Sequence, residues 1–181
     1  MTKAWLTRSL VVGSLLAWGV LPAAGQNDTS ADSSAHPHAA RFRARLGGYQ
    51  EVPAVSTPGR GHLKAKVTDS GIAFVLQYKG LQGERTPAVS LHFGQRGVRG
   101  GLVTVLCGGD VRPECPAGAG TVKGVIHAQE IVGPGAQGIR PGQIGEVLRA
   151  MLRGKTYVNV HTTAFPRGEI RGQVVTNKRR D

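Results

Sequence analysis

Residues 157–174 read YVNVHTTAFPRGEIRGQV, and this stretch decides the fold class. Apolar and polar residues alternate on both sides of Pro166-Arg167-Gly168, which is the pattern of two half-buried strands joined by a turn. Val158 and Val160 are expected to face a core. The opposite face of the same strand then carries Tyr157, Asn159 and His161.

The same period of two recurs from Arg41 onward. Thr68-Asp69-Ser70-Gly71 separates two alternating runs and predicts a hairpin turn. Strands are expected at 41–46, 62–67, 72–79, 88–93, 102–107, 121–128, 156–162 and 169–176. About eight short strands between glycine- and proline-rich turns predict an all-β fold, an antiparallel β-sandwich or flattened barrel.

One segment departs from this period and predicts a short α-helix over residues 142–153. Pro141 stands at its start and Gly154 just past its end, as expected for helix punctuation. The apolar residues follow helical spacing, and we expect them to form a stripe that covers one end or edge of the sandwich. They are Ile144, Val147, Leu148, Met151 and Leu152.

The N-terminal residues predict export. Lys3 and Arg8 precede an apolar run, and Ala23-Ala24-Gly25 supplies a cleavage site, so residues 1–25 are expected to be a signal peptide. Residues 26–40 have the composition of a disordered linker, residues 41–176 form the domain, and residues 177–181 form a basic tail. We expect a secreted or periplasmic protein with no transmembrane segment in the mature chain.

The cysteines Cys107 and Cys115 are expected to form a disulfide, because an exported protein meets an oxidising compartment. Their spacing excludes a CxxC redox site.

The formal net charge is +12, which favours anionic partners. Export and the lack of aromatic residues interleaved with the basic ones argue against nucleic acid. Lipid headgroups and envelope polymers remain.

Several stretches together resemble the CHRD domain, first recognised in chordin. They are LGGYQEVPAVSTPGRG at 46–61, LHFGQRG at 91–97, AMLRG at 150–154 and the closing motif at 157–174. The resemblance extends over about residues 41–175 and marks Glu51, Asn159 and Arg171 as motif positions. Family members often carry His-x-His where this chain has Ser90-Leu91-His92.

Two interpretations of His92, His161 and Glu169 stay open. They bind a transition metal, with Glu169 as a ligand or as a support for His161, or they form a hydrogen-bonded polar cluster in which Glu169 orients His161 or pairs with Arg171. Ser90 in place of a histidine leaves a metal one ligand fewer, which weakens the metal interpretation. No cofactor other than this possible transition metal is expected.

No sequence pattern indicates an enzyme. The sequence around Ser90 offers no catalytic base with a group to orient it, and no Gly-x-Ser-x-Gly or phosphate-binding loop is present. The acidic residues are few and scattered, so they do not suggest the paired carboxylates of a glycoside hydrolase. We therefore expect a non-enzymatic binding or structural module whose partner is an extracellular or envelope component. The alternatives are a metal-binding protein and adhesion to anionic surfaces through the basic residues.

Overall fold

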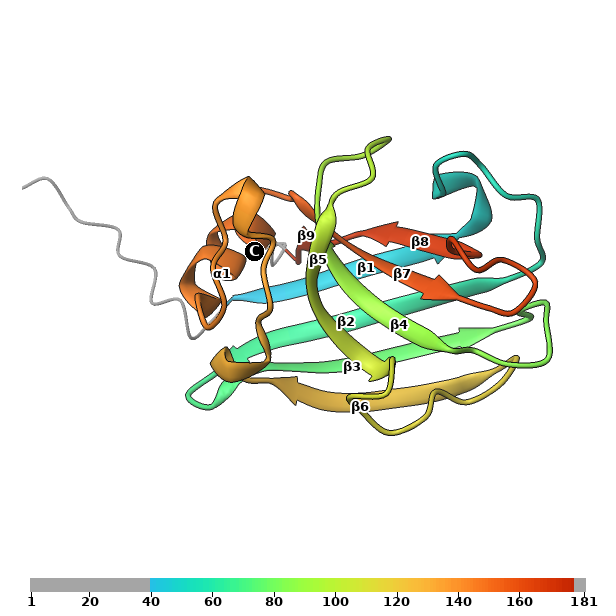
Figure 1. Ribbon diagram of the computed structural model, residues 1–181, viewed down its shortest axis with the longest axis horizontal. Helices are drawn as coiled ribbons and strands as arrows, with labels where there is room; N and C mark the ends of the chain where they lie inside the picture. Colours follow the sequence, from blue (N-terminus) through green and yellow to red (C-terminus); the bar gives the residue numbers. More distant parts are fainter. Residues whose placement is uncertain (1–39, 178–181) are drawn as a thin grey trace, which may run out of the picture. The chain divides into compact units, whose positions relative to one another are not determined.

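Four strands form one half of the sheet in the computed structural model, which describes residues 40–177 (Figure 1). They are β1 (Arg41–Gly47), β2 (Arg60–Thr68), β3 (Gly71–Lys79) and β6 (Gly120–Ile126). Phe42, Ala44 and Leu46 are buried, whereas the arginines between them are exposed. Because successive Cβ atoms point to opposite faces, one face of this half packs in the core and the other meets solvent. The predicted β2–β3 hairpin is confirmed, with Thr68 opposite Gly71.

The remaining strands make up the other half. They are β4 (Ala88–Phe93), β5 (Gly101–Gly108), β7 (Thr156–His161), β8 (Ile170–Gln173) and β9 (Val175–Thr176). β7 and β8 pair antiparallel, with Val160 opposite Ile170, as the opening stretch predicted. The single strand predicted at 169–176 is wrong in its continuity. At the buried Val174, whose N–H donates to the carbonyl of Thr156, the chain leaves β7, and β9 pairs with β1 instead.

The sheet curls until its ends meet. Its order is β5-β4-β7-β8-β1-β2-β3-β6, all pairs are antiparallel, and the end strands β5 and β6 approach each other. The interior is filled by inward side chains of β1 to β8, among them Phe42, Ile72, Leu91 and Ile170. This nearly closed barrel confirms the predicted all-β antiparallel fold.

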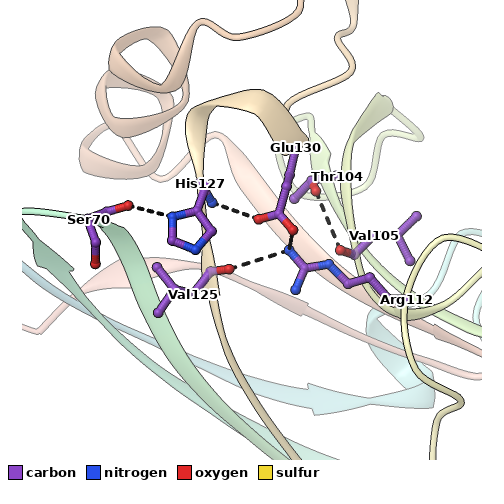
Figure 2. Close-up of polar contacts among 7 residues, drawn as sticks. All are labelled: Ser70, Thr104, Val105, Arg112, Val125, His127 and Glu130. Atoms are coloured by element: carbon purple, nitrogen blue, oxygen red, sulfur yellow. Dashed lines mark hydrogen bonds and ion pairs between the residues drawn. The ribbon is translucent and has the colours of Figure 1, made fainter.

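A polar network joins the loop after β5 to the end of β6. The predicted Cys107–Cys115 disulfide is present, with Cα atoms 5.2 Å apart, and folds this loop back. Figure 2 shows Arg112 of the loop paired at 2.6 Å with Glu130 of the 3-10 helix η3 (Ala128–Glu130). Glu130 also accepts the N–H of His127 at 2.7 Å, and the His127 ring donates to the carbonyl of Ser70 at 2.8 Å. The network therefore ties the β5 loop to β6 and to the β2–β3 turn.

The predicted helix is confirmed as α1 (Ile144–Leu152), which lies at the end of the barrel where β1 begins (Figure 1). Val147, Ala150 and Met151 are buried, but Leu152 is 48% exposed, so the stripe is narrower than predicted. Two further 3-10 helices are η2 (Gly48–Gln50) and η4 (Gly135–Gln137). No helix within residues 40–177 has the length and apolarity needed to cross a bilayer.

The signal peptide predicted at 1–25, most of the linker predicted at 26–40 and the tail from residue 178 onward lie outside the described residues. The strands themselves begin at Arg41 and end at Thr176.

Candidate functional site

Polar side chains gather on the outer face of β4, β7 and β8. Ser90 lies opposite Asn159, and Asn159 lies opposite Arg171; the next row along holds His92, Tyr157 and Gln173. An outer face normally meets solvent, but this one is covered. Ser90, Asn159, Tyr157, Arg171 and Gln173 are each 7% exposed or less. Their polar atoms must therefore find partners within the protein.

His92 and His161 direct their Nε2 atoms at one oxygen, the Oγ of Ser90. The Nε2–Oγ distance is 2.8 Å for His92 and 3.4 Å for His161. The two ring centroids lie 6.4 Å apart. The structure thus brings together the two histidines singled out from the sequence, and it places the serine between them.

Backbone carbonyls determine which nitrogen of each imidazole carries the hydrogen. Nδ1 of His92 lies 3.2 Å from the carbonyl oxygen of Gly100, and Nδ1 of His161 lies 3.0 Å from that of Pro166. A carbonyl oxygen can only accept, so each Nδ1 donates. Burial lowers the pKa of His92 to about 4 and also lowers the pKa of His161. Both rings are therefore neutral at neutral pH, and their Nε2 lone pairs face Ser90.

Arg171 holds the loop that covers this face. Its Nη2 donates to the carbonyls of Gln95 at 3.0 Å and Val98 at 2.7 Å. Its guanidinium carbon lies 3.4 Å from the centroid of the Tyr157 ring, and this ring stacks on His92 with centroids 5.0 Å apart. Stacking and cation–π contact compensate in part for the burial of the charge. Strand alternation had placed Tyr157 on the face of Asn159 and His161, but nothing in the sequence indicated its stacking on His92 or its contact with Arg171.

Glu51 and Asn159 lie against Gly168. A Cβ added to Gly168 would stand 2.7 Å from Oε1 of Glu51 and 2.4 Å from Oδ1 of Asn159, so only glycine allows this approach. Both oxygens are buried without a hydrogen-bond partner among the described residues. Burial raises the pKa of Glu51 to about 7, against the opposing charge of Arg171. Protonation removes the cost of burying a negative charge at this position.

Glu169 belongs to a separate cluster at the end of the hairpin. It is fully buried, and it accepts hydrogen bonds from Thr57 Oγ1 at 2.6 Å, the backbone N–H of Gln82 at 2.8 Å and Thr162 Oγ1 at 2.8 Å. These partners come from two loops and from the residue after β7. The structure engages both of its oxygens there, while His161 bonds Pro166 instead.

The other histidines of the domain lie away from Ser90. His62 is exposed on β2, and His127 contacts the β2–β3 turn. Within residues 40–177 no three or more His, Cys, Asp or Glu side chains gather as a metal-ligand set would. A metal at the predicted place would therefore rely on the two imidazoles and the Ser90 hydroxyl.

Ser90 and His92 also form a hydroxyl–base pair. The Gly100 carbonyl orients the His92 ring, as a third group orients the base in nucleophilic enzymes. The sequence offered no sign of it. Such a pair generates a nucleophile only where a substrate atom can reach the hydroxyl. Ser90 is 4% exposed, and its hydroxyl lies within hydrogen-bonding distance of both imidazoles.

A basic face occupies the outer side of β1, β2, β3 and β6. It consists of the exposed residues Arg41, Arg43, Arg45, Arg60, His62, Lys64, Lys66, Lys79 and Lys123. The register sets like charges directly opposite each other, including Arg43 opposite Lys64. These four strands contain no Asp or Glu. A groove of about 820 Å³ lies over β1, β2 and β3 and is lined by residues that include Arg43, Lys64 and Val75.

The family model of the CHRD domain matches residues 42–174. No curated protein and no solved structure matches the chain.

Proposed function

The chain belongs to the CHRD domain family, and we propose that it acts as an exported, non-enzymatic binding module that holds an anionic polymer of the cell envelope. The observation that carries this proposal is the basic face. The other features bear on where the protein works and on what it does not do.

Repulsion between the cations of the basic face lowers the stability of the sheet. Like charges directly opposite on neighbouring strands destabilise a sheet, whereas opposite charges in the same places would contribute about 0.2–1 kcal/mol per pair. Arg41 faces Lys66, Arg43 faces Lys64, and Arg60 faces Lys79. A bound polyanion would remove this repulsion, so the arrangement fits a surface that is stabilised by its ligand.

The spacing of the charges suits an extended polyanion. Side chains on one face repeat at about 6.7 Å along a strand, and neighbouring strands lie about 4.8 Å apart. The cations therefore form a closely spaced grid that can follow a chain of phosphates or carboxylates. The outward positions of these strands carry no Phe, Tyr or Trp, so the stacking platforms typical of single-stranded nucleic acid binding are not part of this face.

Export and the non-enzymatic role have separate support. The Cys107–Cys115 disulfide fits an oxidising compartment, in agreement with the signal peptide expected from the sequence. The buried position of Ser90 supports the absence of nucleophilic catalysis. The proposal accordingly locates the protein in the periplasm or outside the cell.

The test measures binding of the protein to immobilised polyphosphate and poly-glutamate over a salt series from about 50 to 500 mM, because screening weakens contacts between exposed charges. Arg43→Glu/Lys64→Glu changes the centre of the basic face. Arg140→Glu/Arg153→Glu changes net charge equally at exposed positions outside it.

We expect the first variant to bind at least about tenfold more weakly and the second to bind nearly as the unmodified protein does, since local contacts exceed the effect of net charge. Equal losses in both variants, or binding indifferent to salt, would refute the proposal.

A further inference from the structure

We propose that His92, His161 and Ser90 bind one divalent transition-metal ion of the zinc(II) or copper(II) class. The site is built from β4 and β7, on a different face from the basic strands, and it does not rest on the polymer-binding proposal. Zinc and copper are the metals that imidazole ligands suit best among common divalent ions.

The distances from the Ser90 oxygen to the two imidazole nitrogens match ligand–ligand separations around one metal ion. Two ligands at about 2.0–2.2 Å from zinc lie about 2.8 Å apart at a right angle and about 3.4 Å apart at the tetrahedral angle. The Oγ of Ser90 lies 2.8 Å from Nε2 of His92 and 3.4 Å from Nε2 of His161. Small rotations about the side-chain bonds would therefore suffice to place the donors around an ion.

The hydrogens available at this site do not satisfy both imidazoles, because the Ser90 hydroxyl can donate to only one Nε2 atom. Both Nδ1 atoms carry the ring hydrogen, because each faces a backbone carbonyl. Both Nε2 atoms are therefore acceptors, and the Ser90 hydroxyl has one hydrogen to give. His92, at the shorter distance, is the natural recipient, so the Nε2 lone pair of His161 is left facing an oxygen. A metal ion between them would satisfy both lone pairs at once.

The outer contacts are those of metal-ligating histidines. Such a histidine usually donates its second ring nitrogen to a carbonyl or carboxylate, which fixes the tautomer and aims the ring. Gly100 serves His92 from the loop after β4, and Pro166 serves His161 from the β7–β8 turn. The stacking of Tyr157 on His92 restrains that ring further.

The charges around the site limit its affinity. Arg171 acts electrostatically on His92, and Arg99 acts on His161, in both cases against a positive charge. With two neutral nitrogen ligands and one hydroxyl, we expect a dissociation constant of about 1–100 µM and coordination positions completed by water. Removing the exposed Arg99 should tighten binding about threefold or more.

The experiment titrates zinc(II) and copper(II) into the full chain by calorimetry and records copper(II) spin resonance. Every protein carries His36→Ala/His38→Ala, so that this pair before the domain contributes no imidazole ligands to the titration. His161→Ala is the loss variant, and His62→Ala is the matched control at an exposed histidine outside the site. Thermal unfolding of each variant verifies that it is folded.

Ser90→Cys is the gain variant, since a thiolate of similar size binds zinc far more strongly than a hydroxyl. We expect one equivalent of metal in the parent, at least about tenfold weaker binding in His161→Ala, no change in His62→Ala and at least about tenfold tighter zinc binding in Ser90→Cys. Cobalt(II) should give a thiolate absorption band in Ser90→Cys alone.

Copper(II) bound to the parent should show two imidazole nitrogens, and one in His161→Ala. The proposal is overturned if a folded His161→Ala binds as the parent does, if His62→Ala loses the metal equally, or if Ser90→Cys shows neither tighter binding nor the cobalt band.

Discussion

Replacement of Glu51 by glutamine should remove most of the pH dependence of stability that this carboxyl imposes on the domain. Glu51 is 6% exposed, and its Oε1 lacks a hydrogen-bond partner within residues 40–177. Burial raises its pKa from 4.5 to about 7. The folded state therefore holds a proton that the unfolded chain has already released between these two values.

The magnitude follows from this difference. The difference between a pKa of 4.5 and one of about 7 corresponds to about 3.5 kcal/mol, because a tenfold change in proton affinity is worth about 1.4 kcal/mol. Because the folded pKa lies above the unfolded one, this contribution to stability is complete below pH 4.5 and is lost as the pH rises through about 7. Glutamine has nearly the same size and is neutral throughout this pH range.

The assay is urea denaturation of both proteins at about pH 5 and about pH 8.5. We expect Glu51→Gln to have nearly the same free energy of unfolding as the parent at the lower pH and about 2–3 kcal/mol more at the higher pH. Histidines and other carboxyls titrate alike in both proteins, so the difference isolates Glu51. Glu84→Gln, at an exposed glutamate, is the control. A parallel pH dependence in parent and variant would refute the reasoning, as would a Glu51→Gln protein that is less stable at high pH.

Three further changes have defined outcomes. Lys64→Glu should raise the free energy of unfolding by about 0.2–1 kcal/mol, because it creates an opposite-charge pair with Arg43. The same change should weaken polyanion binding. A variant that lost both stability and polyanion binding would contradict the basic-face argument. Replacing Cys107 and Cys115 by serine should lower the free energy of unfolding by about 2–3 kcal/mol, measured by denaturation of the variant against the parent. Glu169→Gln should lower the free energy of unfolding by about 2–4 kcal/mol, because the three groups that donate to Glu169 lose a charged acceptor. The zinc titration should stay unchanged. A loss of metal binding would mean that the Glu169 cluster and the Ser90 site are coupled.

Much of the fold could be predicted because its causes are local. Alternation in 41–46 and 157–161 identified strands and their inward faces, and helical spacing after Pro141 identified α1. The disulfide followed from compartment and spacing. These inferences need only the geometry of one strand or helix, which a short run of residues specifies.

The structure departs from the sequence-based expectations where contacts with other parts of the chain determine the position of a residue. Leu152 fits the apolar stripe by spacing, but its side chain stays 48% exposed at the helix end. The final strand breaks at Val174 because two different neighbours, β7 and β1, take its two parts. Glu169 faces Thr57 and Gln82 because loops far away in sequence reach the hairpin end. None of these contacts leaves a periodic signal in the chain.

By itself, the sequence determined which residues share a face, since backbone geometry forces side chains in a strand to alternate. It therefore placed Tyr157, Asn159 and His161 together and put the arginines of β1 outward. Only the tertiary structure decided that one polar face meets solvent and the other is buried. The loop carrying Gln95 and Val98 can cover the second face because its carbonyls accept the hydrogen bonds of Arg171, and a buried charge persists only with such partners.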